Sequence, residues 1–456
     1  MMNRKPRGET SIGDCPSSKT TGVHLVETPA LCKADLTNFI RESGKEKSLH
    51  AVGPEFELFG FHRNTLSRLN PTDVEKVLNG FSASTRSRTE ENGLTTEITT
   101  DFGRITLEPG GQIELSGWPR KTIKEIESDL NLYLSRLHEI SEENGFIFLA
   151  AGFDPVRTLQ EQNWIPKKRY KLMKPYLAEK GARAWDMMTR TCAIQANLDY
   201  ENEIDLAKKF LLGNRLGPII AAIFANSPFQ EGKPSGYKST RYAVWLETDC
   251  DRTGVSPAAT GKFSVDQFVD YALSVPMFFV RRDGTYINLL GRQFDQFLDG
   301  ELIEEVPKMQ DFVDHLTTIF TDARIKPHVE VRSADSGGVE QVLALQALWK
   351  GLMYDEATLD ESLRIAPNLD QNGFAALQLD VAKNGLAANN ILNVLGFAKE
   401  TVRLAVEGLR RVEPAEVGYL KILEQQVIDD ETCPADILLR QSQKDGKVPT
   451  DSLRVA

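Results

Sequence analysis

The chain has 456 residues, of which 41% are hydrophobic and 26% charged, a composition typical of a globular protein with one large domain or two to three ordinary ones. Its formal net charge of −11 argues against nucleic acid as the main partner, although local arginines can still hold anionic ligands. No stretch approaches the roughly 18 apolar residues of a membrane span, so we expect no membrane partner.

Both the N-terminus and the cysteines bear on where the protein works. Residues 1–25 are polar and lack the apolar core of a signal peptide, so we expect a flexible N-terminal tail. Five cysteines are widely scattered without a CxxC pair, which fits a reducing compartment better than a disulfide framework or a zinc site. These features predict a cytoplasmic location.

Strand-like and helical stretches alternate along the chain without an internal repeat or a clear linker, which favours one large α+β unit. We expect a single domain over 26–440 and a flexible tail over 441–456, with residues 339–440 mostly helical. In chain order we expect a helix over 34–44, a strand over 50–61, a hairpin over 94–108, a helix over 122–145, strands over 147–155 and 189–200, a helix over 206–227, a strand running into a loop over 241–254, a helix followed by a hairpin over 266–290, a helix over 306–320 and a strand over 326–338.

Two pairs of glutamates are the most informative local feature. Glu55 and Glu57 lie two apart in a strand and therefore project from the same face. Glu108 and Glu114 flank the turn signal Pro109-Gly110-Gly111, and a hairpin there would place both on one face together with Gln112. Four carboxylates on such strands repel one another unless cations lie between them, which suits Mg²⁺ and therefore phosphate chemistry.

Two further strands carry polar side chains on one face. Gln195 and Asn197 share a face of the strand over 189–200, and Glu330 and Arg332 share a face in the strand over 326–338. For any single strand, a solvated outer face is the simpler interpretation. The recurrence of amide, carboxylate and guanidinium groups in four separate segments favours a shared concave site. Cys192 lies on the opposite, apolar face, so we interpret it as a core residue.

Two basic segments remain open to more than one interpretation. The loop Asp249–Gly254 is most simply a solvent-facing turn, although its Arg252 could hold a substrate carboxylate. The run Lys167–Arg169 is most simply a surface patch, although it could cover phosphates or a carboxylate. No GxxxxGK[ST], GxGxxG or GxSxG motif occurs, so any nucleotide must bind through another architecture.

Several motifs, taken in order along the chain, resemble glutamate–cysteine ligases of the family that includes the plant and many proteobacterial enzymes. They are EPGGQIELSG, MMTRTCAIQANLDY, ETDCDRTG and VDHLTTIFTDARIKPHVEVRSAD, and the resemblance extends from about Val52 into the C-terminal helices. It implies a curved antiparallel half-barrel flanked by helices, as in glutamine synthetase. It also implies an activity in which ATP phosphorylates the γ-carboxylate of glutamate and the amine of cysteine attacks the γ-glutamyl phosphate.

The resemblance assigns a role to each matched residue and names ATP and Mg²⁺ as cofactors. As partners it implies only small-molecule substrates, and we expect a monomer or a homodimer. The implied metal ligands are Glu55, Glu57, Glu114 and Glu330, and the implied catalytic residues are Glu55, Glu57, Glu108 and Arg332. Glu108 would contact either the metal or the amine. The implied nucleotide contacts are Gln195, Asn197 and Arg332, and the implied substrate contacts are Arg169, Arg190 and Arg252.

Two departures from the family pattern keep alternative functions open. This chain has GPEFELFGF where plant-like members commonly have a segment like GTEHEKFGF, and EVRSADSGG where they commonly have EMRGADGG. Both changes bear on the amine acceptor more than on the activation of glutamate. The alternatives are a γ-glutamyl ligase of specialised metabolism that uses another amine, and a relative that binds ligand without catalysis.

Overall fold

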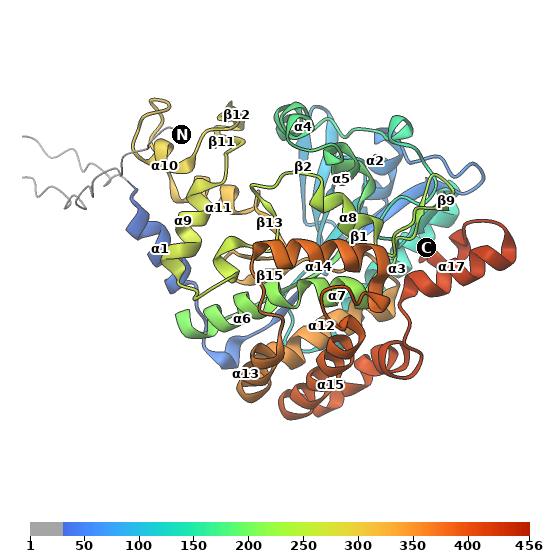
Figure 1. Ribbon diagram of the computed structural model, residues 1–456. Helices are drawn as coiled ribbons and strands as arrows, with labels where there is room; N and C mark the ends of the chain where they lie inside the picture. Colours follow the sequence, from blue (N-terminus) through green and yellow to red (C-terminus); the bar gives the residue numbers. More distant parts are fainter. Residues whose placement is uncertain (1–30) are drawn as a thin grey trace, which may run out of the picture.

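A computed structural model of the protein describes residues 31–456, so the predicted N-terminal tail lies outside the described residues (Figure 1). Within this range, no helix combines the length and the apolar character needed to cross a membrane.

An open, nine-stranded antiparallel sheet forms the centre of the fold, with helices packed around it (Figure 1). Its strand order is β14-β15-β7-β1-β5-β4-β3-β2, and β6 pairs with the second half of β1. The predicted α+β half-barrel architecture is therefore confirmed. The strands of this sheet are β1 (Val52–His62), β2 (Ser87–Glu91), β3 (Leu94–Thr99), β4 (Gly103–Leu107), β5 (Ile113–Gly117), β6 (Phe146–Leu149), β7 (Ile194–Leu198), β14 (Ala323–Ile325) and β15 (Val329–Val331).

Strand β1 is the central element because it pairs with three others. Its first half lies between β5 and β7, with Glu55 opposite Gln195 and Glu57 opposite Glu114. Residues opposite each other in neighbouring strands point to the same face, so the register brings these polar side chains together. Strand β15 extends the same surface, with Glu330 opposite Asn197.

The hairpin between β4 and β5 forms as the Pro-Gly-Gly turn predicts. Its turn is closed by hydrogen bonds from Glu108 N to Gln112 O and from Gly111 N to Glu108 O, both 2.9 Å. Gly111 has φ +77°, a conformation that favours glycine. At Gly110 a Cβ would lie 2.5 Å from the carbonyl oxygen of Thr189, so the turn needs glycine to approach the segment that leads into β7.

Three short two-stranded pairs lie outside the main sheet. Strands β11 and β12 form the predicted hairpin, whose turn residues Asp283 and Gly284 both have positive φ. These pairs comprise β8 (Phe229–Gln230) with β9 (Lys233–Pro234), β10 (Thr253–Gly254) with β13 (Phe320–Thr321), and β11 (Phe279–Arg282) with β12 (Thr285–Asn288).

The helices follow their sequence signals where capping residues are clear. Helix α3 begins after Thr122, which accepts a hydrogen bond from Glu125 N, and ends at Gly145 in the left-handed region, as predicted. The helices up to residue 338 are α1 (Lys33–Glu42), α2 (Pro71–Gly80), α3 (Ile123–Asn144), α4 (Lys168–Lys180), α5 (Ala184–Arg190), α6 (Glu203–Arg215), α7 (Gly217–Ile223), α8 (Thr240–Leu246), α9 (Val265–Ser274), α10 (Phe294–Leu298) and α11 (Met309–Leu316).

The C-terminal region is helical from residue 339, as expected. Helix α12 is almost wholly buried and packs against β1, β7 and α15. Its Gln346 side chain donates a hydrogen bond to the Gln195 carbonyl of β7 at 3.0 Å, which ties the helix to the sheet. The helices of this region are α12 (Val339–Tyr354), α13 (Glu356–Ile365), α14 (Gln371–Asn384), α15 (Val394–Val412), α16 (Lys421–Leu423), α17 (Pro434–Asp445) and α18 (Thr450–Leu453).

The prediction of a flexible tail over 441–456 differs from the structure. Helix α17 continues to Asp445, α18 follows, and Leu453 and Ala456 are buried. The last residues extend the sheet beside β6, because Phe148 N donates to Ala456 O and Val455 N to Phe148 O, each at 2.9 Å. Most residues of this segment are polar because they lie on its outer face, and only a few apolar residues pack against the rest of the protein.

Shortening the buried Leu453 side chain tests this docking. Leu453 packs in a small cluster with Phe59, Phe61 and Leu149, so Leu453→Ala should lower the free energy of unfolding by about 2–5 kcal/mol through the cavity it leaves. Chemical denaturation measures the change. The matched control is Leu132→Ala, at an exposed position of α3, which should change it by less than about 0.5 kcal/mol. Equal, small effects would mean that the segment is frayed after all.

Candidate active site

A cavity of about 210 Å³ lies against the polar face formed by β1, β5 and β7. Helices α4, α5 and α8 supply its other walls, together with residues of β11, β13 and β14. The residues that carry its chemistry are Glu55, Glu57, Glu108, Gln112, Glu114, Arg169, Gln195, Arg241, Arg324 and Arg332. The structure therefore brings most of the polar side chains predicted from strand parity to one cavity, but Asn197 and Glu330 do not line it.

Glu55 and Glu57 project side by side from β1 and are held by β7. Asn197 Nδ2 donates to Glu55 Oε1 at 2.9 Å. Glu57 accepts from the backbone N–H of Ala193 at 2.7 Å and from Gln195 Nε2 at 3.2 Å. These donors fix the carboxylates in place, so their orientation does not depend on a ligand.

Glu114 and Glu108 line the same cavity, and Glu114 lies beside Glu57 on the neighbouring strand β5. Glu114 accepts hydrogen bonds from the hydroxyls of Thr106 and Ser116, at 2.9 and 3.0 Å. Gln112 is 1% exposed and donates to the carbonyls of Met188 and Thr191, which fastens the Pro-Gly-Gly turn to the end of α5. The predicted alignment of Glu108, Gln112 and Glu114 on one cavity wall is confirmed.

The carboxylates in this cavity are electrostatically uncompensated. Burial, followed by repulsion from Glu330 and Glu114, raises the pKa of Glu55 to about 7. Burial and repulsion from Glu114 and Glu108 raise the pKa of Glu57 well above its usual range, and burial with Glu108 raises that of Glu114. Bound protons or cations would therefore stabilise these carboxyl groups.

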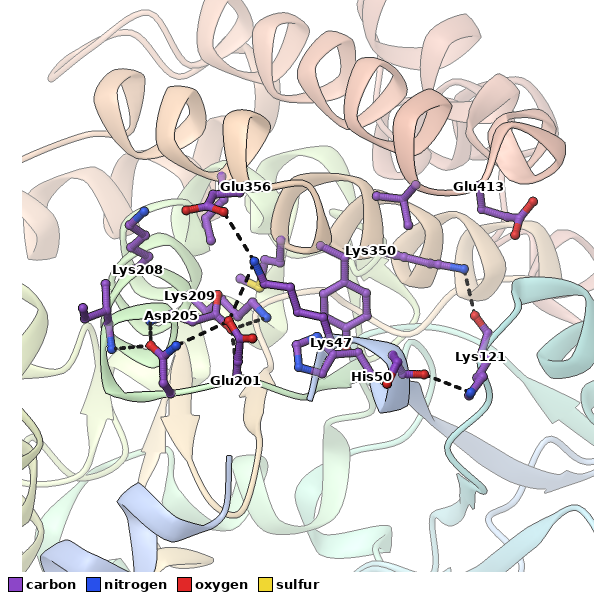
Figure 2. Close-up of a pocket in the computed structure, with 17 residues that line it drawn as sticks. Lys47, His50, Lys121, Glu201, Asp205, Lys208, Lys209, Lys350, Glu356 and Glu413 are labelled. Atoms are coloured by element: carbon purple, nitrogen blue, oxygen red, sulfur yellow. Dashed lines mark hydrogen bonds and ion pairs between the residues drawn. The ribbon is translucent and has the colours of Figure 1, made fainter. Parts of the chain in front are cut away.

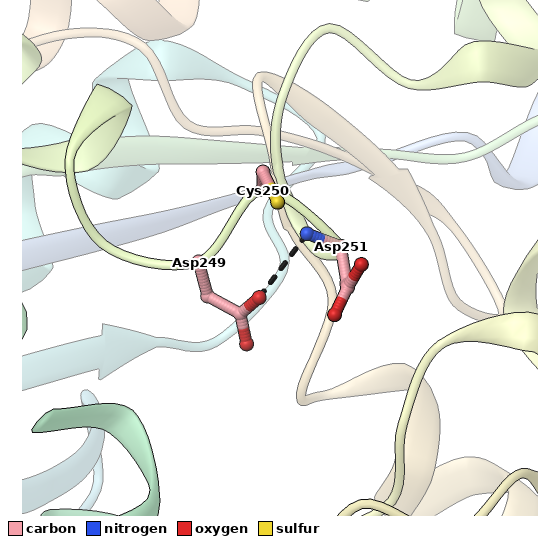
Figure 3. A group of neighbouring side chains, drawn as sticks. All are labelled: Asp249, Cys250 and Asp251. Atoms are coloured by element: carbon pink, nitrogen blue, oxygen red, sulfur yellow. Dashed lines mark hydrogen bonds between the residues drawn. The ribbon is translucent and has the colours of Figure 1, made fainter. Parts of the chain in front are cut away.

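This donor set fits a hard divalent cation such as Mg²⁺, which prefers carboxylate oxygens and keeps water or phosphate oxygens as its other ligands. The glutamates line one cavity, but no three of their carboxylate oxygens lie within 4.8 Å of one another. A bound Mg²⁺ would therefore take some of its ligands from phosphate oxygens. Among residues 31–456 only Asp249, Cys250 and Asp251 are so closely grouped (Figure 3). Their carboxylates already engage Arg252 and Lys180; Asp249 is buried, whereas Cys250 and Asp251 are exposed.

Arg332 and the two amides extend the site across β7. Arg332 Nη1 donates to Gln195 Oε1 at 2.7 Å, and Gln195 in turn donates to Glu57. Asn197 lies further along β7 beside Glu55 and outside the cavity lining. A continuous hydrogen-bonded chain thus links a guanidinium to the carboxylates of β1.

Glu330, a predicted metal ligand, is buried among cations and does not line the cavity. It is 0% exposed, it pairs with Arg324, and its Oε1 lies 3.1 Å from Lys326 Nζ and 3.3 Å from Arg332 Nη1. These cations hold the pKa of Glu330 well below its usual range despite burial. In this structure Glu330 thus holds Arg324 and Arg332 beside the cavity, and its role as a metal ligand stays a prediction.

The three arginines predicted to contact substrate divide between the cavity and the core. Arg169, at the start of α4, lines the cavity and donates to the Tyr170 hydroxyl at 3.1 Å. Arg190 is 1% exposed, pairs with Asp186 at 3.0 Å and lies over the Phe153 ring, outside the cavity lining.

Arg252, predicted to contact substrate, lies in the core and does not line the cavity. It is 0% exposed, pairs with Asp249 at 2.7 Å, donates to the carbonyls of Thr318 and Pro276, and lies over the Phe278 ring. These bonds join the residue before β10 to the neighbouring loops. A polar loop sequence does not reveal that its arginine points inward.

Arg241 and Trp245 are site residues that the sequence analysis missed. The segment was predicted to be a strand, but Thr240–Leu246 is helix α8, and a spacing of four places both side chains on its cavity face. Arg241 is 2% exposed, donates to the Ser333 and Arg332 carbonyls, and its Nε has no hydrogen-bond partner in the described chain. The helical spacing of Arg241, Val244 and Trp245 in the sequence could have indicated this helix.

Cys192 lies in the core, as its strand face predicts. It is 0% exposed, and burial, followed by the nearby Glu57 carboxylate, raises the pKa of its thiol well above the usual range. A protonated thiol in this position has no nucleophilic role.

Comparison with known proteins assigns first the fold and then the family. A solved glutamate–cysteine ligase from Francisella tularensis, in complex with AMP, aligns with a TM-score of 0.53 and 13% identity over 87% of this chain and 85% of that one, which shows a shared fold. A sequence model of glutamate-cysteine ligase family 2 matches residues 51–453. The chain belongs to this family.

Plant relatives match almost the whole chain. The chloroplastic glutamate–cysteine ligase of Brassica juncea is 37% identical over 445 residues, covering 96% of this chain and 86% of the relative, and that of Arabidopsis thaliana is 36% identical over 444 residues, covering 96% and 84%. Because these relatives are named chloroplastic, the predicted cytoplasmic location is contradicted. Plastid-directing segments are polar, so the lack of an apolar leader does not indicate the cytoplasm.

The reassigned role of Arg252 can be tested by separating stability from substrate binding. Arg252→Ala leaves the Asp249 carboxylate buried and unpaired, so it should lower the free energy of unfolding by about 3–5 kcal/mol. At a temperature where the variant remains folded, its KM for glutamate should equal that of the wild type. Removing a surface pair with Arg364→Ala should cost at most about 1 kcal/mol. A raised KM for glutamate without loss of stability would instead show that Arg252 contacts the substrate.

Proposed function

We propose that this protein joins the γ-carboxylate of glutamate to the amine of cysteine in an ATP- and Mg²⁺-dependent reaction that forms γ-glutamylcysteine. The observation that carries the proposal is a cavity lined by several glutamates and several arginines together. Transfer of a phosphoryl group needs positioning and neutralisation of charge, and this arrangement offers both. Family membership and the glutamate–cysteine ligases among its relatives support the same reaction.

Glu55, Glu57, Glu108 and Glu114 are proposed to hold Mg²⁺ against the phosphates of ATP. Bound there, Mg²⁺ would neutralise charge on the phosphate oxygens. The hydrogen bonds from Asn197, Gln195 and Ser116 hold three of these carboxylates before any ligand enters. Such preorganisation avoids the energetic cost of reorienting the site during phosphoryl transfer.

The arginines are proposed to neutralise the anionic groups of the reactants. Arg332 is aimed by Gln195 and is our proposed contact to the transferred phosphoryl group. Arg241, with a buried Nε that lacks a partner in the described chain, is suited to the carboxylate of an amino-acid substrate. Arg169 of α4 also lines the cavity and has the same chemistry.

An apolar wall closes the cavity opposite the carboxylates. Met173, Met187, Met188, Trp245, Phe279 and Phe320 line it. A wall of this kind excludes water, which would otherwise hydrolyse an acyl phosphate before the amine attacks. It also suits a small, weakly polar side chain such as that of cysteine.

One assay distinguishes the proposed acceptor from another amine. The protein is incubated with ATP, Mg²⁺ and glutamate, and a panel of amines that includes cysteine is supplied in turn. We expect phosphate release and a γ-glutamylcysteine mass that both depend on cysteine. Turnover with a different amine alone would reject cysteine as acceptor, and the absence of ADP under every condition would reject catalysis.

Replacing the proposed metal-binding glutamates by glutamine tests their role. Glu57→Gln and Glu114→Gln keep the side-chain size but remove negative charge, so each should reduce kcat/KM by at least about 10²-fold, the scale of losing one electrostatic contact to the transition state. Steady-state kinetics at saturating Mg²⁺ measures the loss. The control is Glu301→Gln, at an exposed position, which should have wild-type kinetics. Near-normal rates for both site variants would refute the metal assignment.

Proton release on metal binding tests the raised pKa of Glu55. In the metal-free protein a carboxyl with a pKa of about 7 holds part of a proton at neutral pH, and Mg²⁺ must displace it. The affinity for Mg²⁺ should therefore rise with pH through neutrality. Calorimetry at pH 7 in two buffers of different ionisation enthalpy should show net proton release, which Glu55→Gln should reduce. Binding without proton release would contradict the coupling.

A further inference from the structure

A second cavity, of about 490 Å³, shares no lining residue with the catalytic one (Figure 2). It lies between the short helix Lys47–Leu49, the start of α6, the end of α12, the start of α13 and the end of α15. Its volume is in the range of small-molecule sites. Nothing in the proposed reaction uses it.

Lysines give this cavity its chemical character. Five line it, against four carboxylates, in a chain whose net charge is −11. Lys350 is only 4% exposed, and the described chain gives its ammonium two acceptors, Glu416 at 2.7 Å and the Lys121 carbonyl at 2.8 Å. An ammonium has three donors, so one remains for a ligand.

The rim lysines are weakly held and accessible. Lys47 lies 3.4 Å from Glu356 and 3.7 Å from Glu201, and all three side chains are exposed, so these pairs contribute little and can open. Lys121 is exposed and donates to the Ser48 carbonyl at 2.9 Å. Figure 2 shows these groups around one hollow with Lys350.

The cavity also offers an apolar and aromatic surface. The rings of His50 and Tyr354 lie 5.1 Å apart, and Met353 and Leu359 are buried beside them. Ammonium groups beside such a surface suit an anionic molecule that has a compact organic body, with its charge on carboxylate or phosphate groups.

Asp199 connects this cavity to the strands that carry the catalytic carboxylates. Lys209 and Tyr354, which line the cavity, bind the backbone of Asp199: Lys209 Nζ donates to its carbonyl at 2.8 Å, and its N–H donates to the Tyr354 hydroxyl at 2.9 Å. Tyr354 donates to Ala51 O at 2.6 Å, and the Asp199 carboxylate accepts from Ala51 N at 3.0 Å. Ala51 directly precedes β1 and Asp199 directly follows β7.

We propose that this cavity is an effector site for a small organic anion, and that its occupation alters catalysis through the Ala51–Asp199 junction of β1 and β7. The same junction lies two residues from Asn197, which holds Glu55. A ligand that draws Lys209 or Tyr354 toward itself would shift the ends of both strands, and with them the carboxylate wall.

Binding is tested first and does not depend on turnover. Calorimetry with citrate as the carboxylate probe and pyrophosphate as the phosphate probe, in metal-free buffer with the catalytic cavity saturated by ADP, should detect one site for at least one probe. Lys47→Gln/Lys121→Gln should weaken that binding at least tenfold. Lys444→Gln/Lys447→Gln, which makes the same charge change at exposed positions elsewhere, should leave it unchanged. No binding of either probe at about 10 mM, or equal binding by both variants, would overturn the site.

Coupling is then measured with the probe that binds. At constant free Mg²⁺, that probe should change kcat/KM for glutamate or ATP at least about fivefold in the wild type. It should have no such effect on Lys47→Gln/Lys121→Gln, whose basal rate should equal that of the wild type. Tight binding without any kinetic change would overturn the proposed connection through Asp199, whereas failure of basal turnover in every form would count against the proposed function instead.

Discussion

Burial and mutual repulsion of the carboxylates on β1, on β5 and in the turn between β4 and β5 are the constraint on which the rest of this structure depends. Glutamates on adjacent strands are unstable neighbours unless the surrounding protein fixes them and a cation or proton neutralises them. The chain meets the first need with amide and hydroxyl donors from Asn197, Gln195, Thr106 and Ser116. The second need is the chemical basis for placing Mg²⁺ and the phosphates of ATP in this cavity.

The basic side chains around the cavity are arranged so that they do not cancel this negative wall. Arg324, Lys326 and Arg332 gather on the buried Glu330, one strand beyond β7, and Arg241 is held by backbone carbonyls. Glu55 and Glu57 accept their hydrogen bonds from neutral donors instead. The cavity therefore offers carboxylates that can attract cations and arginines that can attract phosphate and carboxylate groups.

The packing behind the sheet explains why a helical C-terminal half belongs to the same unit. Helix α12 lies directly against β1 and β7, and Gln346 bonds to the backbone of Gln195. At the other end of these strands, Tyr354 of the same helix bonds to Ala51 and Asp199. One buried helix therefore supports the carboxylate strands along their length and also lines the second cavity.

The sequence by itself determined the alternation of side chains in the strands, the Pro-Gly-Gly turn and the helical C-terminal region, because these depend on short-range periodicity and backbone preference. It thereby identified Glu55, Glu57, Glu108, Glu114, Gln195 and Arg332 as candidates for one site, and the structure places all six at one cavity. Motif resemblance added the family. Only the tertiary structure decided which arginines face that cavity, because Arg252 and Arg190 are buried by elements distant in the sequence. Arg241 reaches the cavity from a helix whose sequence had been interpreted as a strand. The tertiary structure also decided the position of Glu330 among three cations and the docking of the last residues against β6, since ion pairs and edge pairing depend on segments that meet only after folding.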